Sequence, residues 1–335
     1  MNTRNSSQPV LPASTPSSLE PQQCCEDQLT KALRRLLLKP EQMLALGYPM
    51  RQESQTYFYI NSPPKSTKKT RPKASLNVPK LVPSCFQGDE KNIRSCDRCQ
   101  QHFNISKRNF NLSDNCVHHW GRKEGPFGHR RYSCCNAPVE HKGCTMGQYH
   151  VHRNTLPGYN GSLEGYVQAR FSRGGIYALD AEMIYTTGGM ELARIALVDA
   201  SGNPVYDTLV KPCSEILDCN TFFSGISPED MSTAVKTLKD VQRDILQFIG
   251  YDTILIGHAL ENDLRALKLV HGAIVDTCVL YPDRRGLPYK RALRFLTKEY
   301  LGREIQQGQK GHAPVEDARA ALELAFLAIK KCSSS

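Results

Sequence analysis

The chain has 335 residues, enough for two domains, and its 43 Lys and Arg against 33 Asp and Glu give a formal net charge of +10. This basic excess favours a polyanionic partner, and because no apolar run approaches the ~20 residues of a membrane-spanning helix, we exclude an integral membrane protein. Residues 1–173 hold 25 basic and 12 acidic side chains, a net of +13, whereas residues 174–335 hold 18 and 21, a net of −3. The asymmetry predicts a basic arm or module attached to a near-neutral globular domain.

The N-terminal segment 1–84 is expected to be a mostly disordered basic arm, because it begins with a Ser, Pro and Gln-rich stretch that has little to bury. Within it, leucines at helical spacing predict a short amphipathic helix over residues 27–46, interrupted by Pro40 and continued by a second helix that ends at Gly47. Such a helix docks either on the chain's own core or on a partner.

A basic run follows the helical segment. Lys65–Lys73 carries five positive charges in nine residues. It fits a nuclear-import signal or an RNA-contacting arm, and a solvated linker is the alternative. We therefore expect a nuclear protein, with a further cytoplasmic pool left open.

Residues 85–152 contain seven of the thirteen cysteines, several histidines and few long apolar runs. The chain starts without the charged and apolar features of a secretory signal, so the cysteines favour metal binding over disulfides. A segment with so little core needs a metal to fold, and we expect a zinc-binding module. Residues 153–173, rich in Gly, Asn and Ser, are expected to be a linker.

The ligand spacing in this module predicts two zinc sites. Cys96-x2-Cys99 followed by Cys116-x2-His119 is typical of one tetrahedral site. A second site is expected from the remaining ligands, with free thiols as the alternative, and these ligands are Cys134, Cys135, Cys144 and His150. The basic residues between the ligands would give the module an RNA-facing surface.

The segment 174–331 has the pattern of a mixed α/β domain. Strands are predicted in three neighbouring segments and in two later ones, which are Ile176–Met183, Ala193–Asp199, Val205–Lys211, Thr253–Ile256 and Ile274–Thr277. Helical spacing covers Thr233–Ile249, Glu261–Val270, Lys290–Leu301 and Pro314–Lys331. Three strands in a meander, followed by alternating helix and strand, predict a ribonuclease H-like mixed sheet flanked by helices.

Acidic residues interrupt these elements at particular places. Asp180 and Glu182 share one face of the first strand, because side chains alternate along a strand. Buried carboxylates require a counter-charge, which Lys, Arg or a metal can supply, unless both point outward from an edge strand. Asp263 and Asp317 each lie in the predicted first turn of a helix, where acids are also favoured by the helix dipole, and His312 precedes Asp317 in a loop.

The motifs around these acids resemble a known family. Six stretches carry the likeness in the same order, namely YALDAEM, NTFFSGI, LIGHALENDLRALKL, VDTCVLYP, LPYKRALRFL and GHAPVEDARAAL. The sequence resembles DEDDh-type 3′→5′ exonucleases of the RNA exonuclease 1 homolog family. All five catalytic positions of that family are present, and these are Asp180, Glu182, Asp263, His312 and Asp317. Relatives commonly carry Cys where this chain has Ala181, a side chain expected to face away from the metals.

The resemblance implies two Mg²⁺ or Mn²⁺ ions held by the four carboxylates. Asp180 is expected to bridge the ions, Glu182 and Asp317 to complete the first ion's ligands, and Asp263 to support the second. His312, whose unperturbed pKa is about 6.5, would act as the general base toward water. The segment with Phe222, Phe223 and Ile226 is expected to approach the 3′-terminal nucleotide, with core packing as the alternative. Lys290 and Arg291 are expected either to contact phosphate or to cover a solvated helix face.

These features together predict a 3′→5′ exoribonuclease that trims single-stranded RNA ends by a two-metal-ion mechanism and releases nucleoside 5′-monophosphates. Single-stranded DNA is left open as a second substrate. The alternative from another class is a non-catalytic nuclear factor that binds RNA or protein and retains a nuclease-like fold.

Overall fold

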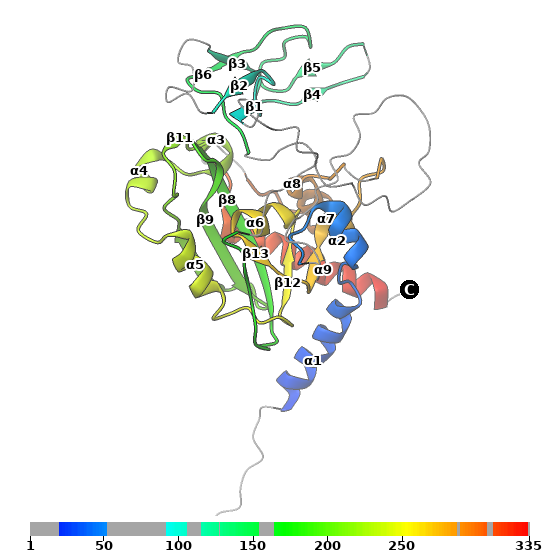
Figure 1. The fold of residues 1–335 in the computed structure, drawn as a ribbon. Coiled ribbons are helices and arrows are strands. Elements are labelled where there is room, and N and C mark those ends of the chain that lie inside the picture. The colour runs from blue at the N-terminus through cyan, green and yellow to red at the C-terminus, as the bar shows by residue number, and fades with distance from the viewer. Residues whose placement is uncertain are drawn as a thin grey trace, which may run out of the picture.

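The structure is a computed structural model that describes residues 20–51, 92–105, 115–126, 128–153, 164–286, 289–306 and 311–333, with backbone alone for 20–26 and 332–333. Figure 1 shows a larger sheet-and-helix part, and above it a smaller part built from short strands. The basic run 65–73 and most of the predicted disordered arm lie outside the described residues.

A mixed sheet forms the centre of the larger part. Strands β8 (Ile176–Thr186), β9 (Gly189–Asp199) and β10 (Pro204–Leu209) form an antiparallel meander. β12 (Ile254–Gly257) and β14 (Ile274–Asp276) then extend the sheet in parallel, which gives the order β10-β9-β8-β12-β14. The predicted mixed sheet is confirmed, and its strand order fits a ribonuclease H-like fold.

Helices cover both faces of this sheet (Figure 1). On one face, alternate residues of β8 and β9 such as Leu179 and Ile195 pack with the side chains of α5 and α6. On the other face, Ala178 and Val198 pack with α9. A short strand, β11 (Ile216–Asp218), pairs with the end of β8. The helices of the larger part are α3 (Thr221–Ser224), α4 (Pro228–Ser232), α5 (Leu238–Ile245), α6 (Glu261–Ala266), α7 (Thr277–Leu280), α8 (Leu293–Leu296), the π-helical η2 (Thr297–Leu301) and α9 (Pro314–Ser333).

Two predicted helices are shorter than their apolar spacing indicated. The Thr233–Ile249 helix is present as α5, which begins only after Thr237, whose hydroxyl caps it by accepting from the Asp240 amide. The helix predicted to reach Val270 ends at Ala266, because Lys268 adopts a left-handed conformation with φ 52°. Leu269–Val270 forms instead the strand β13, which pairs with β7 (Val167–Gln168) inside the predicted linker.

The N-terminal helices pack on the chain's own core. α1 (Glu20–Arg34) begins before the predicted residue 27, and α2 (Pro40–Leu46) ends at Gly47, as expected. Leu33 is buried on the α9 side of the sheet, and the backbone amide of Leu38 donates to Ile274 at 2.8 Å. The buried Tyr48 hydroxyl donates to Asp276 at 2.5 Å. The predicted docking on the chain's own core is therefore confirmed.

The smaller part, which we call the module, spans the described residues from 92 to 153. It contains three two-stranded pairs, which are β1 (Ile93–Ser95) with β2 (His102–Asn104), β3 (Cys116–His118) with β6 (Thr145–Gly147), and β4 (Lys123–Glu124) with β5 (Arg131–Tyr132). Its small core joins the larger part through Tyr185 of β8. Arg98 also forms a partly buried ion pair with Asp218 of β11 at 2.8 Å.

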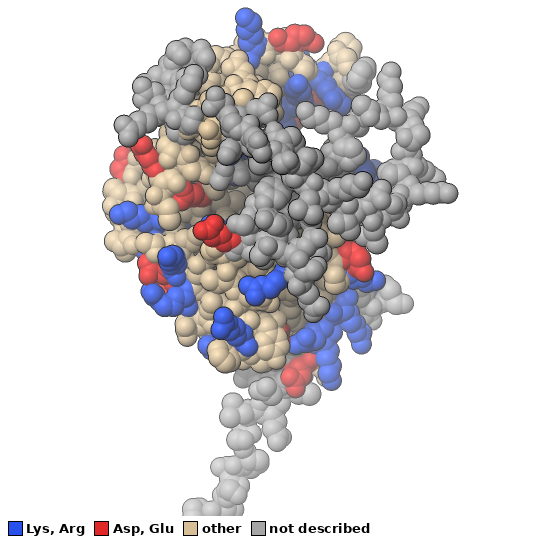
Figure 2. Space-filling model, in the orientation of Figure 1, with Lys and Arg blue, Asp and Glu red and all other residues tan. Residues whose placement is uncertain are grey.

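Charged side chains of both signs are interspersed over the face seen in Figure 2, and Lys and Arg gather where α1 and the end of α9 lie. No helix in the described ranges combines the length and the apolar character needed to span a membrane.

Candidate active site and metal clusters

Three elements bring the predicted acids together. Asp180 and Glu182 lie on the face of β8 that is covered by α9, whereas Ala181 packs into the core on the opposite side. The backbone amide of Ala181 donates to Asp263 Oδ1 at 2.9 Å, which fixes the first turn of α6 against β8. Asp317 lies in the first turn of α9. The two acids of β8 and the acids at the starts of α6 and α9 therefore lie together.

His312 completes this group from the loop before α9. Its Nδ1 atom lies 3.7 Å from Glu182 Oε1 and 3.6 Å from Asp317 Oδ2. Asp317 is 2 % exposed, and its Oδ2 accepts a 2.9 Å hydrogen bond from Gln306 Nε2. The other oxygen, Oδ1, is buried without a hydrogen-bond partner. A polar side-chain atom from each of Glu182, His312 and Asp317 lies within 4.8 Å of the others.

Burial and mutual repulsion disfavour ionisation of these acids. Burial, followed by the charges of Asp263, Asp317 and Glu182, raises the pKa of Asp180 well above its usual value. Burial and the neighbouring acids raise the pKa of Glu182 to about 9, and burial raises that of Asp317 to about 7. Among the described residues, no Lys or Arg nitrogen lies within 4.0 Å of the four carboxylates. In the described part of the chain, the site acids therefore have no direct Lys or Arg partner, and only the more distant charges of Arg194 and Arg303 lower the pKa of Glu182 and of Asp317.

His312 is held near a pair of aromatic residues. Its backbone amide donates to the Phe223 carbonyl at 3.0 Å, so the loop before α9 is tied to α3. Burial, followed by the charge of Arg294, lowers the pKa of the His312 imidazole. The neutral form, which can accept a proton, is thus favoured.

The predicted substrate contacts differ in their placement. Phe222 and Phe223 are exposed, whereas Ile226 is 1 % exposed and packs with Ile184 and Met231, so the expected nucleotide contact is wrong for Ile226. The turn at Gly225, with φ 67°, directs Ile226 into the core.

The two basic candidates both form ion pairs. Lys290 pairs with the buried Glu261, and Arg291 pairs with Glu299. Both also line an open pocket of about 470 Å³ on the surface. The sequence left open whether Lys290 and Arg291 only cover a solvated helix face, and their ion pairs show that they do not.

The cysteines and histidines of the module form two compact clusters. In the first, Cys96 Sγ lies 3.6 Å from Cys116 Sγ, and Cys99 Sγ lies 3.3 Å from His150 Nδ1. In the second, His119 Nδ1 lies 3.5 Å from Cys134 Sγ and 3.4 Å from Cys135 Sγ, with Cys144 Sγ 3.5 Å from Cys134 Sγ. These cysteines form no disulfide.

The two histidines are exchanged relative to the sequence prediction. His119 was expected beside Cys116, but β3 is extended and rises about 3.3 Å per residue, so His119 is carried away from Cys116. β6 pairs antiparallel with β3 and places Gly147 opposite Cys116. The backbone amide of Cys144 donates a hydrogen bond to the His118 carbonyl. The chain beyond β6 therefore returns His150 to the first cluster, while Cys144 stays beside His119.

Trp120 and Gln306 were not selected from the sequence. Trp120 follows His119 of the second cluster and packs on Phe222 of α3, with ring centroids 4.3 Å apart. Gln306 orients Asp317 from eleven residues upstream, outside the His312–Asp317 motif. Both contacts depend on tertiary packing, although an isolated exposed Trp beside a metal ligand is a usable signal.

The RNase T exonuclease family matches residues 178–325. Exonuclease GOR of Pan troglodytes is 43% identical over 253 residues, which cover 72% of this chain and 36% of that protein. RNA exonuclease 1 homolog of Homo sapiens is 38% identical over 314 residues, 90% of this chain and 24% of that protein. This chain thus spans about a quarter to a third of the length of these relatives.

Among solved structures, the catalytic unit of Neurospora crassa Pan2, with its protease and nuclease domains, is 22% identical, with a TM-score of 0.44 over 51% of this chain and 29% of that chain. The five site residues lie inside the matched exonuclease region, and the relatives extend the likeness into the module. This chain belongs to the RNase T exonuclease family, in the group that includes exonuclease GOR and RNA exonuclease 1 homolog.

Proposed function

We propose that this chain is a 3′→5′ exoribonuclease that hydrolyses phosphodiester bonds at the ends of single-stranded RNA and releases nucleoside 5′-monophosphates. The observation that carries the proposal is the convergence of four acids and His312 at one place, without a Lys or Arg partner in the described part of the chain. The name of one relative, RNA exonuclease 1 homolog, supports RNA as the substrate class. The 3′→5′ polarity rests on the family resemblance alone.

The acids fit a pair of hard divalent cations. Mg²⁺ prefers a few carboxylates together with water and phosphate oxygens, and Asp317 Oδ1 is a buried oxygen in need of a partner. Asp180, Glu182, Asp263 and Asp317 would hold two such ions, Mg²⁺ or Mn²⁺. Bound there, the ions supply stabilisation of the negative charge that develops on the attacking and leaving oxygens.

The protein's own contribution is to position and deprotonate water. His312 lies beside Glu182 and Asp317 and is favoured in its neutral form, so it can accept a proton from a water that approaches the terminal phosphate. The bond from its backbone to Phe223 holds the loop in place. Glu182 and Asp317 stabilise the imidazolium once the proton has moved, because both carboxylates lie within 4 Å.

The proposal is tested with the full chain on a 5′-labelled single-stranded RNA of about a dozen nucleotides, with and without added Mg²⁺. We expect a ladder of shortened labelled products that requires Mg²⁺, with mononucleotides as the released species. Chelators are avoided because they would also strip zinc. Asp317→Asn, purified in the same way, controls for contaminating nucleases, and a matched DNA measures sugar selectivity. A wild-type protein that binds the RNA but never shortens it would favour the non-catalytic alternative.

We also propose that the module binds two structural zinc ions. In a tetrahedral site with Zn–S bonds of about 2.3 Å, sulfur atoms lie about 3.8 Å apart. In the two clusters the donor atoms in contact are 3.3–3.9 Å apart, and all four donors of each cluster lie within 4.8 Å of one another. The hydrogen bond between Cys116 and Cys96 lowers the pKa of the Cys96 thiol and raises that of Cys116, so without an ion this pair favours one thiolate, on Cys96. The proposed ligand sets are Cys96, Cys99, Cys116 and His150 for one ion and His119, Cys134, Cys135 and Cys144 for the other.

Metal analysis of the purified full chain tests these sets. The wild type should hold two zinc ions, and Cys96→Ser with Cys99→Ser should hold one. In that double variant, adding His119→Ala should remove the remaining ion, whereas adding His150→Ala should not. Cys213→Ser, an exposed thiol of the larger part, is the control. The reverse pattern for the two histidines would restore the pairing expected from sequence spacing and refute the one proposed.

A further inference from the structure

The module reaches the active site through a short stretch, Trp120–Lys123, which we call the bridging segment. At its first residue, the Trp120 ring lies 4.3 Å from that of Phe222 and 6.5 Å from that of Phe223. All three rings are partly exposed, with Trp120 at 42% and Phe222 at 53%. Because the Phe223 carbonyl accepts from the His312 amide, this aromatic cluster lies directly beside the general base.

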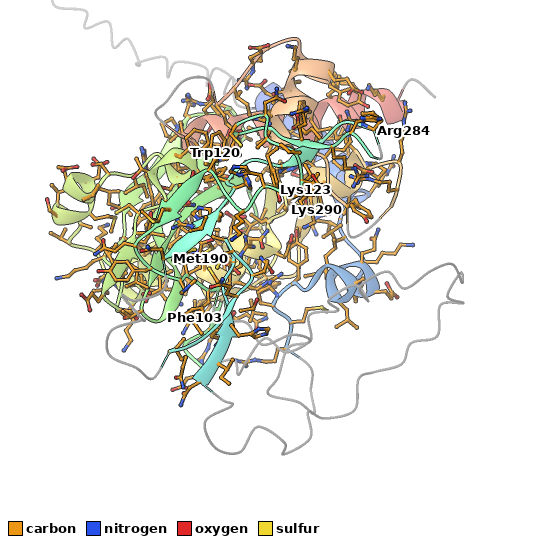
Figure 3. All side chains as sticks on the ribbon, turned by 90° about the horizontal axis from the view of Figure 1, so that it is seen from above. Phe103, Trp120, Lys123, Met190, Arg284 and Lys290 are labelled. Carbon is orange, nitrogen blue, oxygen red and sulfur yellow. The ribbon has the colours of Figure 1, made fainter. Side chains whose placement is uncertain are left out.

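At the other end of the segment, Arg122 lines the 470 Å³ pocket already noted, which we call the cationic pocket. Its other walls come from the larger part, and its lining residues are Arg122, Asp283, Arg285, Lys290, Arg291, Ala292, Phe295, Lys298 and Glu299. Figure 3 looks down on the module, and in this view Lys123 of the bridging segment lies next to Lys290 of the pocket, with Trp120 to one side. The bridging segment thus extends from the aromatic cluster to the cationic pocket.

The composition of the pocket suits a nucleic-acid strand. Five of its lining residues are cationic and two are acidic. Within the described ranges, the Arg122 guanidinium has no carboxylate within ion-pair distance. The other four cations of the pocket each have one acidic partner, and these pairs are Arg285 with Asp283, Lys290 with Glu261, Arg291 with Glu299 and Lys298 with Glu304. Exposed rings accompany these cations, since Arg285 lies over Tyr289 with 3.9 Å to the ring centroid. Basic grooves with aromatic platforms are typical of single-strand binding.

The bridging segment is held rigidly in this position. A Cβ on Gly121 would lie 2.3 Å from the Cys134 backbone nitrogen, so only glycine fits this close approach. The Arg122 amide donates to Ser133 Oγ at 2.9 Å. Cys134 belongs to the second metal cluster, and His119 of the same cluster directly precedes Trp120. The cluster therefore fixes where the Trp120 and Arg122 side chains project.

We propose that the bridging segment and the cationic pocket together form a groove for the single-stranded RNA upstream of the 3′-terminal nucleotide. Trp120 and Phe222 stack on bases close to the reacting end. Arg122 and the cations of the pocket contact backbone phosphates further along the strand. The module therefore supplies part of the substrate site, and the proposal rests on the exoribonuclease function proposed above.

Binding is measured in the non-cutting Asp180→Asn background, by fluorescence anisotropy on a labelled RNA of about a dozen nucleotides. Arg122→Glu should weaken binding about tenfold and reduce the slope of log K against log salt by about 0.7 per lost phosphate contact. Trp120→Ala should weaken binding about 5- to 100-fold and leave the salt slope unchanged, because stacking is not electrostatic. Arg122→Lys should retain most of the affinity. Arg243→Glu, an equal charge change on the exposed face of α5, is the control.

Cutting is measured separately in the otherwise wild-type chain. The loss in kcat/KM caused by Arg122→Glu should be several-fold larger on the dozen-nucleotide RNA than on a dinucleotide, because a dinucleotide has no upstream phosphates for Arg122 to contact. Unchanged Kd and unchanged length dependence in both Arg122→Glu and Trp120→Ala would overturn the groove. If the wild type cuts no RNA, the proposed function fails. The Kd values of Arg122→Glu and Trp120→Ala, compared with that of Arg243→Glu, still show whether the groove binds RNA.

Discussion

Asp180→Asn should lower the rate of RNA hydrolysis by about 10³-fold or more and, in the metal-free protein, raise thermal stability. The two effects have one cause, because burial, followed by the charges of three other acids, raises the pKa of Asp180 well above its usual value. Loss of a carboxylate that holds a catalytic ion removes several kcal/mol of transition-state stabilisation, which is about a thousandfold in rate. Without ions, the same loss relieves repulsion, and about 1 kcal/mol corresponds to a rise of about 2–4 °C in Tm.

Calorimetry with and without Mg²⁺ measures the stability part of this prediction. Added Mg²⁺ should raise the Tm of the wild type, since an ion that binds only the folded state stabilises it, and should raise that of Asp180→Asn much less. Glu323→Gln on the exposed side of α9 is the matched loss of a carboxylate and should change neither activity nor the response to Mg²⁺. A lower Tm for metal-free Asp180→Asn would show that Asp180 is a structural acid and not a member of a repulsive cluster.

The grouping of the acids could be predicted from the sequence because each acid lies in a short motif with a defined place in the fold. Asp180 and Glu182 share a face of β8 by strand alternation, and Asp263 and Asp317 start helices that follow the sheet. Short motifs carry these relations, so their order along the chain was sufficient. Their charge environment was also predictable in kind, since buried acids need a counter-charge.

The Cys and His clusters of the module show where prediction from sequence spacing fails. Cys116-x2-His119 has the spacing of a metal-binding turn, but the residues between them form β3, and an extended chain separates the two side chains. The partner of each histidine is set by the antiparallel register of β3 with β6, a long-range property that spacing does not encode. In the same way, Ile226 is apolar like its neighbours, and only the turn at Gly225 decides that it enters the core.

Two further predictions stay predictions. The domain boundaries at 84/85, 152/153 and 173/174 fall partly in stretches outside the described residues. The basic run Lys65–Lys73, on which nuclear residence depends, also lies outside them. Part of the predicted linker 153–173 belongs to the larger part, because β7 within it pairs with β13.

Substitution of His312 is the sharpest test of the proposed catalytic chemistry. His312→Ala should lower kcat by about 10²- to 10⁴-fold, the usual contribution of a general base, and leave the Kd for RNA nearly unchanged. Its backbone amide can still donate to Phe223 in the variant, so the loop and α3 keep their connection. His129→Ala, an exposed histidine of the module, is the control for loss of an imidazole.

Added imidazole separates a chemical role for His312 from a structural one. The alanine variant leaves space beside Glu182 and Asp317, because the wild-type ring lies within 4 Å of both carboxylates and is 37% exposed. A small base from solution can enter such a site and accept the proton, so imidazole should restore part of the lost kcat, more so as its neutral fraction increases with pH. A ring that served only to hold the loop could not be replaced by a freely diffusing one. Release of mononucleotides by His312→Ala at the wild-type rate would remove His312 from the mechanism.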